Sequence, residues 1–332
     1  MYRALRPLLF RLEPERAHEL TLRALRVAET LRLVGRGTPT RTPFARRLMG
    51  LEFPNRVGLA AGFDKNGTCI DALAGLGFGF IEIGTLTPLA QAGNPRPRLF
   101  RVPHAHALVN RMGFPNIGAE AACARLRRRR TTVLGINIGK NAATPVSRAV
   151  DDYLAALRIV YPHADYIALN VSSPNTAGLR ELELPERLGP LLQALLEARA
   201  VLAAGSARRV PLLVKLSPDL SAEELEATAR TLAAVGIDGV IATNSTVQRA
   251  LPGGAALDEA GGLSGAPLLP LATQTVGRLR TLLGPGFPII GVGGIDSPQA
   301  ARAMLDAGAD LIQIYTGLVY RGPHLPRLLS QL

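Results

Sequence analysis

Short apolar runs recur through the chain from residue 51 onward, and this rhythm is the feature that most constrains the fold. Helical patterns such as Asp151–Tyr161, Ala222–Val235 and Pro298–Ala307 separate most of the runs. The runs have the length and the β-branched content of buried strands. Eight strands alternating with helices predict an α/β fold of the (β/α)₈ TIM-barrel class. We expect the strands at Val57–Ala60, Phe80–Ile83, Val133–Ile138, Tyr166–Val171, Leu212–Leu216, Val240–Ala242, Ile289–Val292 and Leu311–Ile314.

A doubly wound sheet is the competing fold, but no GxGxxG stands between a first strand and a first helix. Two gaps are unusually long, the one between the second and third runs and the one between the sixth and seventh. Long insertions of this kind on a barrel usually carry site residues or a lid. We therefore expect both insertions to lie near the functional site.

Small and polar residues follow directly on most of the predicted strands. In a barrel these positions meet at the C-terminal mouth, where active sites are built. Amides offer donors and acceptors on one group, which suits a flat heterocycle with alternating C=O and N–H edges. Glycines after the seventh strand allow backbone N–H groups to close on a phosphate. The residues at these ends are Ala61, Gly62, Lys65, Thr85, Asn137, Asn170, Ser173, Lys215, Thr243, Asn244, Ser245, Gly293, Gly294, Tyr315 and Thr316.

Lysine is scarce in this chain, and its positions are informative. Lysine and arginine together number 38, yet only Lys65, Lys140 and Lys215 are lysine. All three follow apolar runs. Lysine is retained where a compact, strongly hydrated or pKa-tunable cation is needed and a guanidinium does not serve. The three positions therefore indicate a site.

The strand ends hold no group of acidic or histidine residues apart from Asp64. His104 and His106 are interpreted as a solvated turn, and Cys69 and Cys123 as buried thiols rather than metal ligands. We expect no metal site. A mouth with lysines, amides and a phosphate pocket but no paired carboxylates suits redox chemistry by a bound phosphorylated cofactor better than hydrolysis.

The first fifty residues carry eleven arginines against four glutamates, more than half of the net charge of +12. Residues 1–35 are predicted as two short helices punctuated by Pro7 and Pro14, and residues 37–50 as a linker. From the pattern alone two interpretations stay open: a helical cap on the main domain, or a basic amphipathic pair on an anionic membrane. Arg127–Arg130 is interpreted as the solvated end of a helix. No aromatic residues interleave with these basic clusters, so we expect no nucleic-acid binding.

No apolar run is long enough to span a membrane, and the N-terminus has no continuous apolar core of a signal peptide. We therefore expect a protein on the cytoplasmic side that does not cross the membrane.

A set of motifs resembles the dihydroorotate dehydrogenase family over nearly the whole chain. The N-terminal FRLEPERAHEL at residues 10–20 is similar to the membrane-associated, quinone-dependent class. Two departures are slight: Ser245 stands where Thr is common, and Phe63 where Leu is. The motifs are AAGFDKNG (60–67), IEIGTLTP (81–88), NRMGFPN (110–116), GINIGKN (135–141), NVSSPNT (170–176), IATNST (241–246), GGLSG (261–265), IIGVGGI (289–295) and QIYTG (313–317).

The resemblance implies FMN-dependent oxidation of dihydroorotate to orotate in pyrimidine biosynthesis, with a membrane quinone as acceptor. Ser173 would take the C5 proton while the C6 hydride passes to flavin N5. A cytosolic relative of the other class carries Cys at this position, so Ser173 also favours the quinone-dependent class. FMN would contact Ala61, Gly62, Lys65, Thr85, Asn137, Asn170, Lys215 and Thr243, with its phosphate on Gly265, Gly294, Tyr315 and Thr316. Substrate would contact Lys65, Asn110, Arg111, Met112, Gly113, Phe114, Asn170, Asn175, Asn244 and Ser245.

The resemblance further implies a division of the chain. Residues 1–36 would form the membrane and quinone-access segment, with His18 and Arg101 at the quinone headgroup, and residues 51–332 the catalytic barrel. The protein would lie peripherally on the cytoplasmic face of the cell membrane. Serine is a weak base and needs a polarised site that excludes water. The loop at Asn175–Glu183 is a candidate lid that would exclude it.

Overall fold

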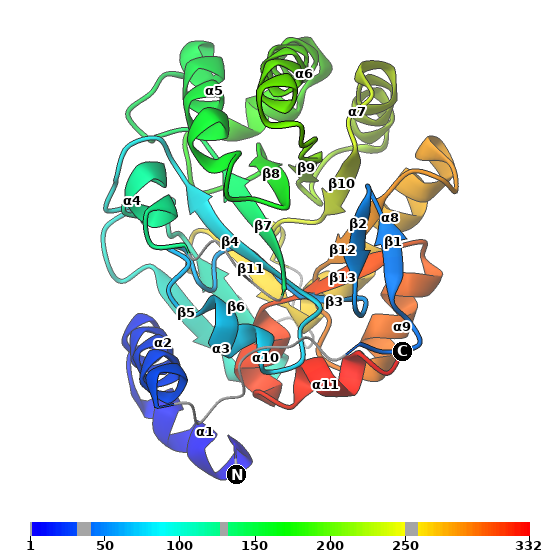
Figure 1. The fold of residues 1–332 in the computed structure, drawn as a ribbon. Coiled ribbons are helices and arrows are strands. Elements are labelled where there is room, and N and C mark those ends of the chain that lie inside the picture. The colour runs from blue at the N-terminus through cyan, green and yellow to red at the C-terminus, as the bar shows by residue number, and fades with distance from the viewer. Residues whose placement is uncertain (1, 32–40, 127–131, 250–257) are drawn as a thin grey trace.

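A computed structural model describes residues 2–31, 41–126, 132–249 and 258–332. Its centre is a closed barrel of parallel strands in the order β10-β12-β13-β3-β4-β7-β8-β9 (Figure 1). All eight predicted strands are confirmed. Their bounds are β3 Val57–Leu59, β4 Phe80–Leu86, β7 Val133–Ile138, β8 Tyr166–Asn170, β9 Leu212–Leu216, β10 Gly239–Ala242, β12 Ile289–Val292 and β13 Leu311–Ile314.

The helices between the barrel strands form an outer ring. Apolar residues on their inner faces, such as Leu157 and Leu192, are completely buried against the strands. The ring helices are α3 Ile70–Ala74, α4 Ala119–Cys123, α5 Ala149–Val160, α6 Pro185–Ser206, α7 Ala222–Val235, α8 Leu269–Leu283 and α9 Pro298–Asp306, followed by α10 Thr316–Arg321 and α11 Leu325–Leu329.

Among the described residues α6 alone is long and apolar enough, by length and composition, to cross a membrane. Its inner face is buried at Leu188, Leu191, Leu192 and Leu195. It also packs between α5 and α7 (Figure 1). These four leucines are therefore accounted for by the place of α6 in the ring, whereas Val201 near its C-terminal end is 75% exposed.

A small hairpin covers the N-terminal end of the barrel. Strands β1 Arg46–Leu48 and β2 Leu51–Phe53 pair antiparallel, and Phe53 packs edge-on against Phe80 of β4 at 5.3 Å. The turn residues Met49 and Gly50 both have positive φ, as a two-residue hairpin turn requires. The expectation of a plain linker over 37–50 is therefore wrong for its last residues. Residues 37–40 and the Arg127–Arg130 cluster lie outside the described residues.

The two long insertions meet in a three-stranded antiparallel sheet. Strands β5 Leu99–Val102 and β6 Ala107–Asn110 come from the first insertion, and β11 Gly262–Gly265 comes from the second. Gly262 allows a close approach, because a Cβ there would lie 1.9 Å from the Ser245 hydroxyl oxygen. The sheet therefore lies directly over residues that follow the barrel strands. Short 3₁₀ helices among the described residues lie at Pro103–Ala105, Val146–Arg148, Leu179–Glu183 and Ala266–Leu268.

Two helices, α1 Tyr2–Arg11 and α2 Pro14–Thr30, lie outside the barrel at one side (Figure 1). Glu13 caps α2 by accepting the backbone N–H groups of Glu15 and Arg16, and Pro14 occupies the first turn as expected. Pro7, expected to bound a helix, lies inside α1. The pair packs on α3, β5 and α10.

One buried ion pair fastens α2 to the barrel insertion. The Glu15 carboxylate accepts Arg98 Nη2 at 2.7 Å, and both side chains are more than nine-tenths buried. Arg96, whose side chain is half exposed, donates to the same carboxylate at 3.0 Å. Burial alone would raise the pKa of Glu15, but the hydrogen bonds and charges of the two arginines outweigh it and lower the pKa.

Candidate active site

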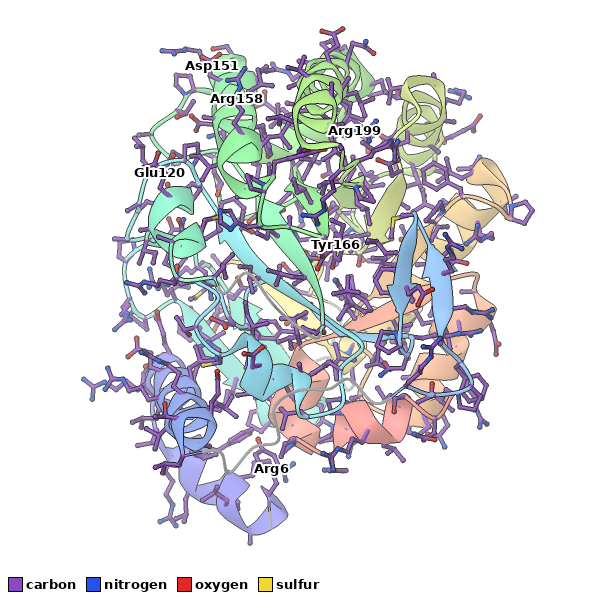
Figure 2. The ribbon with its side chains drawn as sticks, in the orientation of Figure 1. Arg6, Glu120, Asp151, Arg158, Tyr166 and Arg199 are labelled. Carbon is purple, nitrogen blue, oxygen red and sulfur yellow. The ribbon has the colours of Figure 1, made fainter. Side chains whose placement is uncertain are left out.

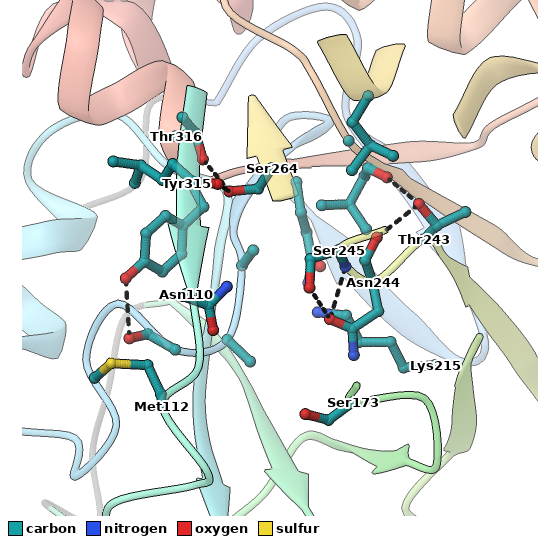
Figure 3. A pocket seen from close by; sticks show the side chains of 18 of the residues that line it. Asn110, Met112, Ser173, Lys215, Thr243, Asn244, Ser245, Ser264, Tyr315 and Thr316 are labelled. Carbon is teal, nitrogen blue, oxygen red and sulfur yellow. Dashed lines mark hydrogen bonds between the residues drawn. The ribbon is translucent and has the colours of Figure 1, made fainter. Parts of the chain in front are cut away.

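A pocket opens at the C-terminal ends of the barrel strands, beneath the β5–β6–β11 sheet. It holds about 1080 Å³ of space, including solvent at its mouth. Residues from the ends of β3, β4, β8, β9, β10, β12 and β13 line it, together with residues of both insertions. Lys215, Asn244 and Ser245 lie on one side of the space, and Asn110, Met112 and Tyr315 on the other (Figure 3).

The pocket brings together nearly all the side chains that the sequence places in the site. The predicted residues that line it are Ala61, Gly62, Lys65, Thr85, Asn110, Met112, Gly113, Phe114, Asn170, Ser173, Asn175, Lys215, Thr243, Asn244, Ser245, Gly265, Gly294, Tyr315 and Thr316.

Two predicted contact residues do not line the pocket. Asn137 is fully buried one layer below, where its amide oxygen accepts the Thr85 hydroxyl at 2.6 Å. Arg111 points away from the pocket. Its guanidinium stacks 4.6 Å from the Phe100 ring and donates to Glu259 at 2.7 Å. Both side chains are thus hydrogen-bonded outside the pocket lining, Asn137 also donating to Glu82 at 2.9 Å.

A chain of hydrogen bonds fixes the amides of the pocket floor. Asn244 donates to Asn170, Asn170 to Thr85, Thr85 to Asn137, and Asn137 to Glu82, over distances of 2.6 to 3.2 Å. These residues belong to β4, β7 and β8 and to the end of β10, so the chain crosses the barrel. Because each amide orientation depends on the next, the polar edges that face the pocket are preorganised.

Glu82 lies at the centre of the barrel and was not predicted. Its buried carboxylate accepts Asn137 Nδ2 at 2.9 Å, the Tyr166 hydroxyl at 2.8 Å and Gln313 Nε2 at 2.7 Å. Tyr166 lies near the barrel axis (Figure 2). Burial and the neighbouring Glu82 raise the pKa of Tyr166 well above its usual value, so the phenol stays protonated and donates. Polar residues inside otherwise apolar strands, as in FIEI and LIQI, were the signal that could have identified this layer.

The two pocket lysines are desolvated cations. Lys65 donates to the Gly62 carbonyl at 2.7 Å, and burial lowers its pKa to about 8. Burial also lowers the pKa of Lys215, while the Glu82 carboxylate opposes that effect. No acidic side chain lines the pocket in the described parts of the chain. The site is therefore suited to an anionic ligand.

Lys140 was expected at the site with the other lysines, but it lies elsewhere. It is buried and donates to the backbone carbonyls of Asn141 and Thr144, at 3.2 and 2.8 Å. Its ammonium fixes the loop after β7. The scarcity of lysine thus identified two pocket residues and one structural residue.

Ser173 lies on the pocket wall after β8 and is 5% exposed. Its Oγ accepts the Asn175 backbone N–H at 3.3 Å. Among the described residues, the Ser173 hydroxyl donates no hydrogen bond to another protein atom. A donor aimed at Oγ stabilises negative charge on that atom.

Glycine backbone forms the wall next to Tyr315. Gly265 and Gly294 both have positive φ, and a Cβ at either would meet backbone atoms at 2.3 and 2.5 Å. The Ser264 and Thr316 hydroxyls bind each other at 2.9 Å beside these glycines (Figure 3). The wall therefore offers backbone and hydroxyl groups at close range, as a phosphate requires.

His18 and Arg101, the two residues assigned to a quinone headgroup, lie between the N-terminal helices and the barrel. His18 contacts Phe63 edge-on at 5.0 Å, and Phe63 contacts Tyr315 of the pocket at 5.6 Å. Burial, reinforced by the Lys65 charge, lowers the pKa of His18 to about 4, so its imidazole is neutral near pH 7.

Arg101 lines a second, open cavity between α1 and β5. Its guanidinium donates to the Leu12 carbonyl at 2.8 Å and lies 4.6 Å from the Phe10 ring centre. Leu99 lines both cavities, so Arg101 and the main pocket are separated by an apolar side chain.

Other residues of the site were not singled out from the sequence. Apolar and polar side chains of both insertions and of β13 complete the lining. They include Leu99, Leu108, Ser264, Leu268 and Gln313. Only Gln313 carried a local signal, as a polar residue within an apolar run. No group of three or more potential metal ligands occurs among the residues that the structure describes.

Comparison with known proteins gives consistent matches. A family profile described as dihydroorotate dehydrogenase matches residues 44–331. A protein of Methylococcus capsulatus named dihydroorotate dehydrogenase (quinone) is 55% identical over 97% of this chain and 95% of its own length. A protein of Albidiferax ferrireducens with the same name is 52% identical over 98% of this chain and 95% of its own.

Two solved structures have the same fold. The DHODH of Eimeria tenella in complex with ferulenol is 35% identical, with a TM-score of 0.87 over 96% of this chain and 90% of that chain. The ligand-free type from the same organism has a TM-score of 0.86 at 35% identity, over 96% of this chain and 93% of that one.

Proposed function

The chain belongs to the dihydroorotate dehydrogenase family, of the quinone-dependent type, and we propose how its pocket residues divide the reaction. The enzyme is an oxidoreductase that converts dihydroorotate to orotate in pyrimidine biosynthesis. The observation that carries the residue assignment is the position of Ser173. Ser173 lines the pocket, and none of the other described residues that line it is Asp, Glu or His.

We propose FMN as the flavin of this enzyme. The fit rests on two features: the glycine wall at Gly265 and Gly294, which a Cβ would fill, and the cations Lys65 and Lys215. The buried Gln313 side-chain oxygen has no partner among the described residues and lies at the pocket floor, where a ring N–H would satisfy it. When bound, FMN supplies the hydride acceptor at flavin N5 and returns the electrons to a quinone. The residues proposed to hold it are those predicted from the sequence, with Asn137 acting through Thr85 rather than by contact.

Ser173 is the proposed proton acceptor for C5 of dihydroorotate. A serine hydroxyl removes a carbon-bound proton only where the developing alkoxide is stabilised and water is excluded. The Asn175 N–H on its oxygen supplies part of the stabilisation. Burial of Ser173 to 5% exposure supplies the exclusion.

The substrate is held by charge and by amides. The Lys65 ammonium is suited to the substrate carboxylate as a compact point charge. Asn110, Asn175 and Asn244 present donors and acceptors to the flat ring, and Asn175 donates to Asn110 at 3.0 Å, which fixes both orientations. Met112 and Phe114 close the apolar side of the pocket. Ser245, Asn170 and Gly113 complete the proposed contacts.

The quinone side is assigned to α1 and α2. As a protein of the quinone-dependent type the enzyme is membrane-associated. The two helices carry many of the exposed large apolar side chains. On the helices these are Leu5, Leu8, Leu20 and Val27, and Leu12 and Leu31 directly follow the helix ends, each 40% to 61% exposed. Apolar side chains together with exposed arginines are typical of a helix pair in an anionic membrane surface. We propose the cytoplasmic face, with residues 1–36 as the access segment and His18 and Arg101 near the headgroup.

Two measurements test these assignments. The purified protein should be yellow and should release FMN, identified by chromatography against flavin standards, on denaturation. Its reduced form should pass electrons faster to a ubiquinone analogue than to fumarate or NAD. A protein that cannot be reconstituted with FMN would contradict the cofactor assignment. Equal rates of electron transfer to the ubiquinone analogue, fumarate and NAD would contradict the proposed role of α1 and α2 in quinone access.

A further inference from the structure

Arg180 lies in the 3₁₀ turn Leu179–Glu183 of the loop that follows β8, and its guanidinium binds three separate segments. Its Nε donates to the Ser172 carbonyl at 3.2 Å, and its Nη2 donates to the Ser245 carbonyl at 3.2 Å. Its Nη1 lies 2.9 Å from Asp219 Oδ2. These three acceptors follow β8, β10 and β9, so one fork joins three neighbouring strand ends.

Asp219 extends the connection. Its carboxylate also accepts the Thr246 hydroxyl and, at 2.9 Å, the Val247 backbone N–H. Thr246 in turn exchanges backbone hydrogen bonds with Leu263 of β11, at 3.0 and 2.7 Å. The ion pair of Arg180 and Asp219 therefore reaches from the loop after β8 to the sheet that covers the pocket.

The turn is also fastened at its other end. The buried Glu183 carboxylate accepts the Ser217 backbone N–H at 2.6 Å, at the end of β9. The loop 175–183, interpreted from the sequence as a lid, is thus held against the strand ends at two points.

We propose that Arg180 is a positioning residue for dihydroorotate oxidation, which sets the base Ser173 against the substrate contacts Asn244 and Ser245. The inference rests on the proposed function of Ser173. Ser172 directly precedes the base, and Ser245 lines the same pocket from the end of β10. The Ser172 and Ser245 carbonyls bind the same rigid guanidinium of Arg180. This group therefore fixes the distance between the base Ser173 and the residues that contact the substrate.

An arginine suits this role and a lysine does not. A guanidinium presents several donors in a fixed plane, whereas an ammonium is a point charge on a flexible stem. The side chain of Arg180 is 26% exposed and that of Asp219 is 11% exposed. The bonds are therefore largely shielded from water and define a geometry rather than a surface contact.

The first test is the rate of flavin reduction by dihydroorotate in Arg180→Ala. Small displacements of a catalytic group cost up to roughly 10²-fold, so we expect a loss of that order with FMN still bound. Deuterium at C5 of the substrate should slow the variant more than the wild type, because proton removal becomes limiting. Arg187→Ala is the matched control, since Arg187 follows the same turn but pairs with the exposed Glu181. It should keep the native rate.

A double variant separates this inference from the proposed function. If Arg180 acts through Ser173, then Arg180→Ala should slow a Ser173→Ala enzyme by no more than about threefold. A further loss as large as in the wild-type background would overturn the inference and leave Ser173 as the base. A native rate in Ser173→Ala alone would instead overturn the proposed function.

Arg180→Lys keeps the charge and guards against a variant that does not fold. It should take up FMN and melt within a few degrees of the wild type, yet keep most of the rate loss. Millimolar guanidinium should restore part of the Arg180→Ala rate, while methylammonium should not. Full activity in Arg180→Lys, or equal rescue by both cations, would contradict the role of the planar fork.

Discussion

The barrel mouth and the N-terminal helix pair are held in place by very different means. Around the mouth, the polar side chains stand on buried strand ends and bind one another through the hydrogen-bond chain from Asn244 to Glu82. By contrast, α1 and α2 expose large apolar side chains, and their polar contacts with the rest of the chain include the Glu15–Arg98 pair, Tyr2 and Arg6 on α10, and Arg101 on the end of α1.

This difference matches the two halves of the reaction. Proton removal at the mouth needs groups fixed within fractions of an ångström, which strand ends provide. Access for an apolar acceptor needs a segment that contacts lipid and tolerates motion. The two regions meet at the row His18–Phe63–Tyr315, where an α2 residue contacts the pocket wall through one aromatic ring. Variants that affect one region and leave the other unchanged can test this separation.

The largest expected effect is at the mouth. Ser173→Ala should keep FMN and slow flavin reduction by about 10²–10⁴-fold, the usual cost of losing a positioned proton acceptor. Anaerobic stopped-flow bleaching of the flavin measures this rate. Ser172→Ala is the control, because Ser172 is equally buried but its hydroxyl accepts Asn244 rather than lining the pocket. If both variants lose the same factor, the effect is structural and not basic catalysis.

The next largest effect concerns the helix pair. Glu15→Ala leaves Arg98 buried without its carboxylate, which typically costs about 3–5 kcal/mol. Hydrogen exchange in α2 should accelerate by roughly 10²-fold or more, and quinone reduction should fall while flavin reduction by dihydroorotate stays native.

Arg96→Ala is the matched control for Glu15→Ala. Arg96 binds the same carboxylate, but its side chain is half exposed, so the pair is worth about 0–1 kcal/mol. The lowered pKa of Glu15 adds a pH dependence: the anchor is intact above the ordinary glutamate pKa and is lost as pH falls through the lowered folded value. Slower flavin reduction in Glu15→Ala would show that the two regions are not separable.

The third prediction is a tenfold change in orotate affinity with pH, caused by titration of Lys65. Burial lowers the pKa of Lys65 to about 8 in the free enzyme, so the ammonium is lost as pH rises through that value. If the ammonium binds the substrate carboxylate, orotate affinity should be constant below pH 7 and fall about tenfold between pH 7 and 9. Titration of the flavin absorbance with orotate measures this. Lys65→Arg should bind orotate more weakly but with no such dependence, since a guanidinium stays charged.

The barrel and most of the mouth followed from the sequence because their signals are local. Each buried strand is a short apolar run, and the residue that follows it faces the mouth in any barrel. Asn170, Ser173 and Lys215 could therefore be placed without knowledge of the pairing. Asn137 and Arg111 were predicted to touch ligand, but their side-chain directions depend on neighbours from other segments: Asn137 binds downward to Glu82, and Arg111 outward to Glu259.

Three features were missed for three different reasons. Leu108 of β6 pairs with Ser264 of β11, more than 150 residues later, and no local pattern encodes that register. The β1–β2 hairpin was missed because its turn is Met49-Gly50, and Met rarely adopts the positive φ that it has here. Glu82 was missed because a charged residue does not fit the pattern of a buried apolar strand. Its burial is explained only by three hydrogen-bond donors from other strands, Asn137, Tyr166 and Gln313.

The smallest expected effect tests how α1 and α2 meet the membrane. Arg23 on α2 is exposed and makes no ion pair in the described structure. An arginine near an anionic surface contributes about 1 kcal/mol, so Arg23→Gln should weaken binding to phosphatidylglycerol vesicles by roughly fivefold at low salt. The difference should shrink as salt shortens the Debye length. Arg230→Gln, which removes an exposed charge on α7 on the other side of the barrel, is the control and should bind as the wild type does. Equal losses in the two variants would mean that net charge, and not the N-terminal pair, determines membrane binding. An unchanged Arg23→Gln together with a strong loss in Leu20→Gln, which removes an exposed apolar side chain from the same helix, would mean that apolar insertion carries the attachment.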